Sequence, residues 1–231
     1  MRLIYLGGLV AAVVVAIVIV VAAGGGGKKA ATGGTAGKAT VIALLKGIPQ
    51  NGNTLGKATA PVTITEYGDL VCPVCQAFAL GSETQLINGP VRSGKVKLVY
   101  RGLETASQAA NNGEYAASQI AARAAGLQQR AWQYILIWYN QQGDESTSYV
   151  TDAYMQGIAQ EIPGLNLTRW QSDRNSQTLA NLVTADAQAA GAASYTSTPT
   201  LTITGPKGSA QPIVGVPSSF AAVMAEVQSV S

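Results

Sequence analysis

The sequence of 231 residues contains no histidine, and this absence excludes several large classes of function. Without histidine the chain can form neither a Ser-His nor a Cys-His nucleophilic pair, and it lacks the commonest ligand of catalytic metals. Charged residues are also scarce, at 12% of the chain, and the net charge is only +3. Part of that charge lies in a glycine-rich stretch near the N-terminus, so no basic patch indicates a nucleic-acid partner.

Cysteine is nearly as rare, because Cys72 and Cys75 are the only two in the chain. Their Cys-x-x-Cys spacing is typical of half a zinc site, of a structural disulfide or of a redox-active dithiol. A zinc site would need Asp or Glu for both remaining ligands, which is unusual for structural zinc. A structural disulfide with a two-residue spacer closes too small a loop to stabilise the fold by much. These two arguments favour redox chemistry, and we expect no bound metal.

The residues around the cysteine pair favour redox chemistry independently. Residues 61–67 alternate apolar and polar side chains and are rich in β-branched residues, which predicts a strand. Helical composition follows from Pro73, which fits the first turn of a helix because that position needs no N–H partner. Cys72 is therefore expected at a helix N-terminus, where backbone N–H groups and the helix dipole favour a nucleophilic thiolate. Cys75, one turn further on, is placed to act as the resolving thiol.

Two stretches of the chain carry a resemblance to a known family. Residues 52–75, GNTLGKATAPVTITEYGDLVCPVC, resemble the active-site region of DsbA-like thioredoxin-fold proteins, in particular their membrane-anchored bacterial branch. Residues 198–203, TPTLTI, resemble the cis-proline loop and the following strand of the same fold. The similarity covers about residues 41–231, although the central helical stretch matches in character only. The expected fold class is α/β: a thioredoxin fold with an inserted helical subdomain at about residues 104–193, preceded by an N-terminal transmembrane helix.

The resemblance also implies that Thr198–Pro199 is a cis peptide bond opposite the cysteine pair. Proline is the only residue for which a cis bond costs little, and the exposed backbone before it can pair with an extended client protein. We therefore expect Thr198 and Pro199, together with Pro73 and Val74, to bind substrate. The alternative is that Pro199 is an ordinary turn proline.

Glu66 lies six residues before Cys72 in the predicted strand, where thioredoxin-fold oxidoreductases commonly keep a buried acid. Burial would raise its pKa and suit it to accept or return the proton of Cys75. The alternative is a solvent-facing glutamate on the strand. For Asp69, three residues before Cys72, a cap on the following helix is the alternative to a role in the chemistry.

The dipeptide between the cysteines departs from that of the best-known oxidases of the family. Those often carry Pro-His, whereas this chain has Pro73 and Val74. Because valine offers no charge to stabilise a thiolate, we expect the pKa of Cys72 to be less depressed, and the pair less oxidising, than in those oxidases. The direction of electron flow therefore stays open.

The first 40 residues are expected to lie outside the folded domain. Residues 3–23 are apolar except for Tyr5, and about 20 helical residues span the hydrocarbon core of a bilayer. We expect residues 1–23 to form a transmembrane anchor; the alternative is a cleaved signal peptide, whose apolar region is usually shorter. Residues 24–40 are rich in Gly, Ala, Thr and Lys, which predicts a flexible linker to a domain at residues 41–231. Lysines after the anchor leave its orientation undecided, so the extracytoplasmic location is inferred from the chemistry alone.

Periodicity and turn residues predict the remaining elements. Strands are expected at residues 41–45, 62–67 and 95–100, and a helix at 72–88 makes a right-handed parallel crossover between the last two. Gly89 and Pro90 are expected to end that helix. Further helices are predicted at residues 115–125, 128–141, 148–162 and 167–190, followed by a hairpin of strands at 200–204 and 211–214 and a helix at 217–230. In the helix at 128–141 the large apolar residues recur at helical spacing and indicate core packing; they are Trp132, Ile135, Leu136 and Tyr139.

These observations predict a membrane-anchored thiol-disulfide oxidoreductase that faces the periplasm or cell envelope and needs no cofactor besides its own Cys72–Cys75 disulfide. As a monomeric oxidase it would donate that disulfide to exported client proteins through a mixed disulfide. The resemblance implies a membrane quinone-linked thiol oxidase as its redox partner. A membrane-tethered reductase or isomerase that uses the same residues is the enzymatic alternative. A non-catalytic client-binding or chaperone module with the same fold is the alternative from another class.

Overall fold

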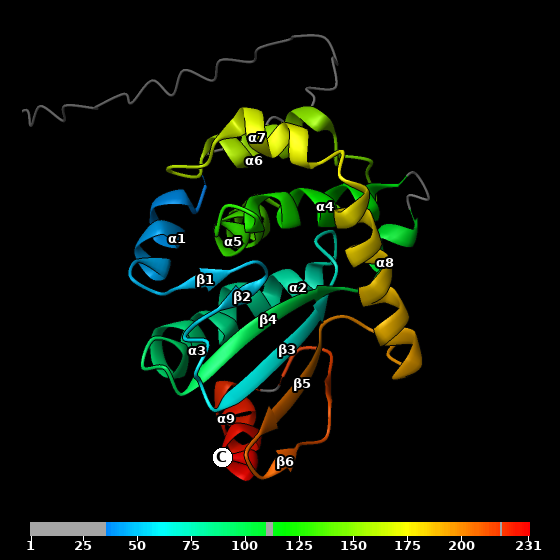
Figure 1. Ribbon diagram of the computed structural model, residues 1–231. Helices are drawn as coiled ribbons and strands as arrows, with labels where there is room; N and C mark the ends of the chain where they lie inside the picture. The colour runs from blue at the N-terminus through cyan, green and yellow to red at the C-terminus, as the bar shows by residue number, and fades with distance from the viewer. Residues whose placement is uncertain (1–35, 110–112, 218) are drawn as a thin grey trace, which may run out of the picture.

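The computed structural model describes residues 36–109, 113–217 and 219–231 (Figure 1). The expected membrane anchor at residues 1–23 and the expected linker as far as residue 35 lie outside this part of the chain. Among the described residues, no helix is both long and apolar enough to cross a bilayer.

A mixed sheet of seven strands forms the centre of the described chain. The strand order is β1-β2-β4-β3-β5-β6, and β7 pairs with β5 beside this path. The bounds are Gln50–Asn51 for β1, Thr54–Leu55 for β2, Val62–Gly68 for β3, Val96–Gly102 for β4, Thr200–Gly205 for β5, Gly208–Ser209 for β6 and Ile213–Val214 for β7. β3 and β4 are parallel, whereas β5 is antiparallel to β3.

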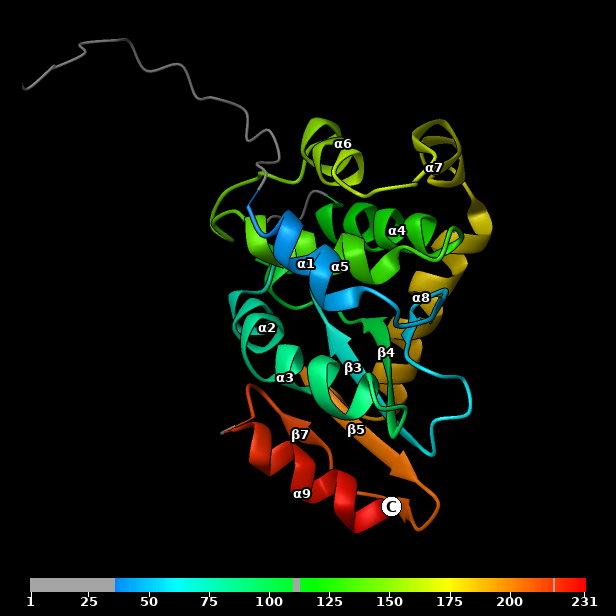
Figure 2. The ribbon, with the colours of Figure 1, turned by 90° about the vertical axis from the view of Figure 1, so that its left-hand side faces the viewer.

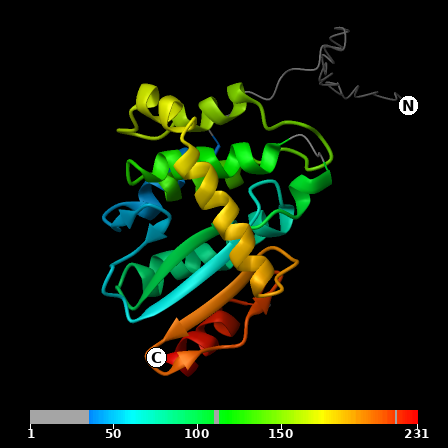
Figure 3. The ribbon, with the colours of Figure 1, turned by 45° about the vertical axis from the view of Figure 1, so that its right-hand side comes forward.

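Helices cover both faces of this sheet (Figures 2 and 3). On one face lie α2 (Pro73–Phe78), α3 (Thr84–Leu86) and α9 (Phe220–Val230), and on the other lies α8 (Gln177–Ala192). A further layer of helices lies beyond the carboxyl ends of β3 and β4 (Figure 2). It consists of α4 (Glu114–Gly126), α5 (Ala131–Gln141), α6 (Asp152–Gln160) and α7 (Leu167–Asp173), with α1 (Lys38–Leu45) beside α5.

The predicted parallel crossover between β3 and β4 is confirmed, because the two strands pair in register along their whole length. The connecting segment is not one regular helix: π-helical turns at Ala79–Glu83 and Ile87–Val91 flank α3. The prediction that Gly89 and Pro90 end the helix is wrong, since Pro90 is buried inside the second π turn. The N–H of Arg92 donates to the carbonyl of Ile87, five residues back (3.1 Å), so the wider turn accommodates a residue without an N–H of its own.

Residues 41–45 belong to α1 and do not form the predicted first strand. Residues 38–40, which were expected in the linker, form the first turn of the same helix. A short apolar run cannot be assigned to strand or helix by periodicity alone. Val41 and Leu45, four residues apart, are both buried on one side of α1, which packs against α5. The edge of the sheet is occupied instead by the hairpin of β1 and β2.

Between β4 and β5 the described residues form helices and no strand, which confirms the predicted helical insertion. α5 lies at its centre and is buried on nearly every side. The four large residues that were predicted to pack in the core of this helix are all buried: Trp132, Ile135, Leu136 and Tyr139.

The single helix predicted at residues 167–190 is wrong, because the chain forms α7 and α8 with a break between them. At the break the Arg174 guanidinium bonds to Asp152 of α6 (2.5 Å) and stacks on the Trp170 ring, 4.9 Å from its centroid. α8 then restarts after Ser176, whose backbone is extended. The bond to α6 and the stacking on Trp170 hold the end of α7 in place, and no local sequence pattern predicts them.

The C-terminal hairpin and helix differ from prediction in their bounds. Within the returning strand predicted at residues 211–214, only residues 213–214 form a strand, β7, and a further short strand, β6, precedes it; both pair with β5. α9 begins at Phe220 and not at residue 217, because the Ser219 hydroxyl accepts a hydrogen bond from the Ala222 N–H (3.1 Å) and caps the helix there. The buried residues of this helix are Val223, Val227 and Val230.

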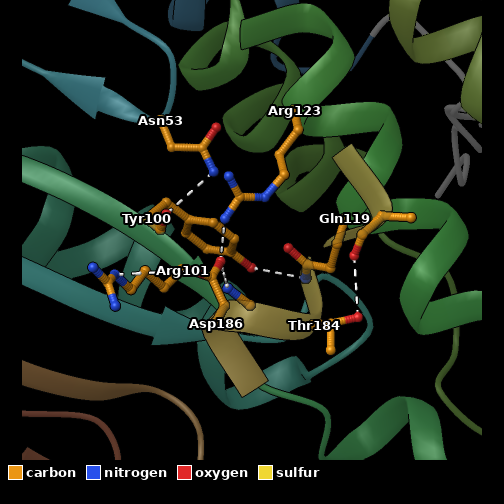
Figure 4. Close-up of polar contacts among 9 residues, drawn as sticks. Asn53, Tyr100, Arg101, Gln119, Arg123, Thr184 and Asp186 are labelled. Atoms are coloured by element: carbon orange, nitrogen blue, oxygen red, sulfur yellow. Dashed lines mark hydrogen bonds and ion pairs between the residues drawn. The ribbon is translucent and has the colours of Figure 1, made fainter. Parts of the chain in front are cut away.

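An ionic cluster ties α8 and α4 to the carboxyl end of β4 (Figure 4). Asp186 of α8 is buried, accepts a hydrogen bond from the Gly102 N–H (3.0 Å) and forms an ion pair with Arg123 of α4. The Nε of Arg101 lies 3.9 Å from the other oxygen of the same carboxylate. Because Gly102 pairs with Gly68 at the end of β3, this cluster fixes the helical layer at the edge of the sheet that carries the cysteine pair.

Candidate active site

Cys72 lies where β3 gives way to α2, as predicted. Its backbone is extended (φ −73°, ψ 121°) and forms the N-cap of α2, with Pro73 in the first turn. The Cys72 carbonyl accepts a hydrogen bond from the Gln76 N–H (3.1 Å), which closes that turn. Cys72 is 5% exposed, Cys75 is fully buried, and both are free thiols.

The sheet brings the two sequence motifs together. Thr200 at the start of β5 pairs with Tyr67 near the end of β3, so the loop before β5 lies beside the cysteine pair. In this loop the Thr198–Pro199 peptide bond is cis. The Sγ of Cys72 lies 3.7 Å from the Thr198 carbonyl oxygen, which accepts the hydrogen bond of the thiol.

Contacts on both sides hold the Thr198–Pro199 loop. The Pro199 carbonyl accepts a hydrogen bond from the Gly215 N–H (2.8 Å), next to β7. The Thr198 hydroxyl lies 2.5 Å from the hydroxyl of Thr105, in the loop after β4. The loop is therefore anchored to the segment after β4 and to the segment after β7.

Hydrogen bonds lower the pKa of the Cys72 thiol to about 6. The largest cause is the hydrogen bond with the Cys75 side chain; burial opposes it, and the Thr198 side chain and the backbone of Cys75 and Val74 add further hydrogen bonds. The Val74 side chain carries no charge, so the thiolate is stabilised by donors of the first helical turn and of the loop opposite. This arrangement favours the thiolate of Cys72, which is the nucleophilic form of a thiol, near neutral pH.

The second thiol behaves in the opposite way. Burial raises the pKa of Cys75 well above its ordinary value, and the hydrogen bond with Cys72 and the negative charge of Glu66 raise it further. Cys75 therefore holds its proton when Cys72 has lost its own. Any reaction that makes Cys75 a nucleophile or a leaving group requires a proton acceptor or donor nearby.

Glu66 lies on β3 with its side chain in the core, where it is 3% exposed, so the solvent-facing alternative is wrong. Burial is the largest cause that raises the pKa of its carboxyl well above the ordinary value. The negative charge and polar contact of Glu83, and then the charge of Cys72, raise it further. Among the described residues, no hydrogen-bond donor is found for either Glu66 oxygen. A buried acid is thus present beside Cys75, as the family resemblance implies.

A second buried acid, Glu83, was missed by the sequence patterns. It ends the π turn Ala79–Glu83 and is 1% exposed, and within the described chain its Oε2 has no hydrogen-bond partner. Burial raises the pKa of this carboxyl too, and its contact with Glu66 offsets that rise only in part. The signal that could have revealed it is spacing, because Cys75, Ala79 and Glu83 recur every four residues and are all buried.

Asp69 does not cap α2, so that alternative is wrong. Its carboxylate is fully buried, and Oδ1 accepts a hydrogen bond from the Val71 N–H (3.0 Å). Oδ2 accepts hydrogen bonds from the N–H groups of Thr105 and Ser107 (both 2.9 Å) and from the Ser107 hydroxyl (2.7 Å). Asp69 therefore joins the segment before Cys72 to the loop that contacts Thr198.

Side chains of the insertion helix α5 form hydrogen bonds with the cysteine segment. The Trp138 indole N–H donates to the Leu70 carbonyl (2.6 Å), and the Tyr139 hydroxyl donates to the Asp69 carbonyl (3.3 Å). The Tyr139 hydroxyl also lies 3.3 Å from that of Tyr100 on β4. Sequence reasoning placed Tyr139 in the core correctly but did not predict the bonds to Leu70 and Asp69, because they join segments about 70 residues apart.

Exposed apolar side chains lie on the two segments that border the thiol. Val74 is 40% exposed beside Cys72, and Val214 and Val216 are 61% and 44% exposed on the segment that bonds to Pro199. In the part of the chain that the structure describes, no group of three or more Cys, Asp or Glu side chains is arranged to hold a metal ion.

Comparison with known proteins gives matches over most of the folded chain. The family model described as "Thioredoxin" matches residues 50–213, which is more than half of the sequence. The chain is 23% identical over 153 residues to a protein of Bacillus anthracis named "Probable disulfide bond formation protein D", covering 66% of this chain and 69% of that protein. The protein of the same name from Bacillus cereus is 22% identical over the same shares.

Solved structures show the same fold at low sequence identity. Oxidised BdbD from Bacillus subtilis matches with a TM-score of 0.62 and 18% identity, covering 79% of this chain and 96% of that one. DsbA2 from Pseudomonas aeruginosa matches with a TM-score of 0.57 and 21% identity, covering 80% and 97%. The alpha-DsbA1 of Wolbachia pipientis matches with a TM-score of 0.62 and 15% identity, covering 80% and 92%.

Proposed function

Because the chain belongs to the thioredoxin family and is a DsbA-like thiol-disulfide oxidoreductase, we propose that it is an oxidase that donates its Cys72–Cys75 disulfide to exported proteins. The observation that carries this proposal is the contrast between the two thiols. Hydrogen bonds stabilise Cys72 as a thiolate, whereas Cys75 is buried and protonated. A stabilised thiolate favours the reduced form of the pair, and a pair whose reduced form is stable is an oxidant towards its clients.

Disulfide donation proceeds in two exchanges. A client thiolate attacks the Sγ of Cys72, the Cys72–Cys75 bond breaks, and Cys75 leaves as a thiolate that takes a proton from Glu66. A second client thiolate then attacks the client sulfur of the mixed disulfide, and Cys72 leaves as a thiolate. Two electrons pass from the client to the cysteine pair. The low pKa of Cys72 makes it a good leaving group in the second exchange.

Client binding is proposed at the surface around Cys72. The Thr198 backbone and Pro199 lie opposite the thiol, where an extended client segment can add main-chain hydrogen bonds. Pro73 and Val74 border the thiol on the other side. The exposed Val214 and Val216, on the segment that bonds to Pro199, add apolar area to this surface, which suits unfolded clients of varied sequence.

The reduced pair must pass its electrons on, and we propose a membrane quinone-linked thiol oxidase as the acceptor. The apolar residues 1–23 would hold the monomeric domain near such a partner on the extracytoplasmic side, with residues 24–37 as a tether to the first helix. The name of the Bacillus relatives, disulfide bond formation protein, supports this direction of electron flow.

The equilibrium reduction potential of the pair in the full-length protein tests the direction. A value near the roughly −120 mV of a strong oxidant supports disulfide donation, whereas one near the roughly −270 mV of thioredoxin makes the protein a reductase. The second outcome has an observation in its favour: a Cys72 pKa of about 6 lies closer to the value of about 7 for thioredoxin than to about 3.5 for DsbA.

Cysteine variants separate the enzyme from a non-catalytic client-binding module. Cys75→Ser should trap clients on Cys72 as mixed disulfides that survive denaturing electrophoresis and disappear on reduction. The double variant Cys72→Ser, Cys75→Ser should lose activity in the refolding of a reduced disulfide-containing client. If the double variant keeps full function in that assay, the chain is a chaperone and the oxidase proposal is wrong.

A further inference from the structure

We propose that Glu83 is a positioning residue of the exchange reaction: it forms one coupled buried carboxyl pair with Glu66 and thereby sets the pH range over which Glu66 exchanges a proton with Cys75. This inference rests on the proposed function, because Cys75 is the resolving thiol of that reaction. It adds a residue that neither the Cys-x-x-Cys motif nor the position of Glu66 specifies.

The two carboxyls come from different elements and lie near enough for each to affect the pKa of the other. Glu66 belongs to β3, at the centre of the sheet. Glu83 belongs to the helical segment between α2 and α3, on the face of the sheet that these helices cover. They are 3% and 1% exposed, so both carboxyls have lost nearly all contact with water. Among the described residues, neither acid takes part in an ion pair, and three of their four oxygens are buried without a hydrogen-bond partner. Buried carboxyls without partners are costly as structural features.

The backbone has an unusual feature next to each of the two carboxyls. A π turn, rather than a regular α turn, ends at Glu83, and the Thr84 hydroxyl bonds to the Ala79 carbonyl within it (3.0 Å). Single π turns occur frequently at functional sites. On the strand, a Cβ on Gly68 would lie 3.1 Å from Oε1 of Glu66 and 2.8 Å from the Tyr100 ring. The absence of a side chain at Gly68 therefore leaves the space that the Glu66 carboxyl occupies.

Among the residues that the structure describes, the other titratable groups that interact with Glu66 are all of a kind that is neutral when protonated and negative when ionised. These groups are Cys72 and Cys75 from the active-site helix, Tyr100 from β4 and Tyr139 from α5. Burial first and then the negative charge of Glu66 raise the pKa of Tyr100, so the same carboxyl acts on several neighbours. With no cation among these groups, each carboxyl is the main charge that the other experiences, and protons leave the pair in two coupled steps.

The coupling between the two carboxyls affects disulfide donation, because this reaction requires a proton for Cys75. When the Cys72–Cys75 bond breaks, the Cys75 sulfur takes a proton from Glu66, and Glu66 becomes a carboxylate beside Glu83. The pair then regains one proton from solvent. A negative charge on Glu83 raises the pKa of Glu66, so Glu66 keeps its proton, and remains able to donate it, up to a higher pH than a single carboxyl would.

The test is the pH dependence of the first exchange in the full-length oxidised protein, measured in single turnover with a dithiol peptide. Glu83→Gln removes the charge with little change in shape, and we expect the high-pH midpoint of the rate profile to fall by about 1–2 pH units. Glu66→Gln should abolish that midpoint, and adding Glu83→Gln to it should have no further effect. The matched control is Glu145→Gln, which removes the same charge from an exposed position and should leave the midpoint unchanged.

A direct titration makes the result independent of activity. Carbon-13 NMR of the glutamate carboxyl carbons follows Glu66 itself, and its titration should move to lower pH in Glu83→Gln. If this titration and the rate midpoint both stay at the wild-type values in Glu83→Gln while Glu66→Gln abolishes the midpoint, the inference is wrong and the oxidoreductase mechanism stands.

If the protein exchanges no disulfides at all, the proposed function fails, and the carboxyl titration still decides whether the pair is coupled. If Glu83→Gln does not fold, Glu83→Asp keeps the charge and should keep a raised Glu66 titration; a lowered one contradicts the inference.

Discussion

Removal of the Cys75 thiol should raise the pKa of Cys72, because the hydrogen bond with Cys75 is the largest single cause of its low value. A hydrogen bond to a charged group contributes about 1.5–3 kcal/mol, and 1.36 kcal/mol corresponds to about one pH unit. In Cys75→Ala the pKa should therefore rise from about 6 to about 7–8. At pH 7 the thiolate fraction would fall from about nine-tenths to between about one-half and one-tenth.

The assay is the rate of alkylation of Cys72 by iodoacetamide as a function of pH, with the ultraviolet absorbance of the thiolate as an independent titration. The midpoint of the profile is the quantity to compare, because the intrinsic reactivity of a thiolate rises with its pKa. Cys75→Ser is the matched variant, since its hydroxyl keeps a donor at the same place and should raise the pKa less. An unchanged midpoint in Cys75→Ala would refute the reasoning, because the backbone donors and the Thr198 side chain would then suffice.

Three further predictions concern stability and support of the site. Asp69→Ala leaves three backbone N–H groups without their acceptor and should destabilise the protein by about 2–4 kcal/mol in urea unfolding. Trp138→Phe removes the hydrogen bond to the Leu70 carbonyl (2.6 Å), and it should cost about 1–3 kcal/mol and change the alkylation midpoint of Cys72. Because the folded-state pKa of Glu66 is raised, the wild-type protein should lose stability as pH rises above about 4.5 towards that raised value, and Glu66→Gln should lose less over this window.

Each of these predictions has a control within the chain. Asp144 accepts the same kind of bonds from Ser146 on an exposed loop, so Asp144→Ala should have a much smaller effect than Asp69→Ala. Trp170→Phe removes a similar indole bond to the Ala121 carbonyl (2.9 Å) far from the thiols, and it should lower stability without moving the Cys72 midpoint. Equal effects within either pair, or parallel stability curves for wild type and Glu66→Gln from pH 5 to about pH 8, would contradict the assignments.

The local sequence was sufficient to predict the backbone elements at the centre of the candidate active site. The alternation at residues 61–67, the composition after Pro73 and the spacing of the cysteines predicted β3, the start of α2 and the position of Cys72 at its N-terminus. These features depend on side-chain periodicity and on capping within one or two turns, and both are encoded by neighbouring residues. The same holds for the apolar face of α5, whose predicted core residues are buried.

Tertiary contacts decided the features that sequence reasoning missed or placed wrongly. Residues 41–45 form a helix because one of its sides packs against α5, and Asp69 turns away from α2 because its carboxylate meets N–H groups of the loop after β4. Glu83 lies in the core at the end of a π turn, and its four-residue spacing from Cys75 and Ala79 indicates burial but does not show that Glu66 lies near it. The sequence by itself thus identified the two residues that we propose exchange a disulfide, since that chemistry depends on residue type and on local backbone geometry. Only the tertiary structure decided which groups control their protons, because burial and the field of a distant carboxylate depend on segments that the chain brings together after folding.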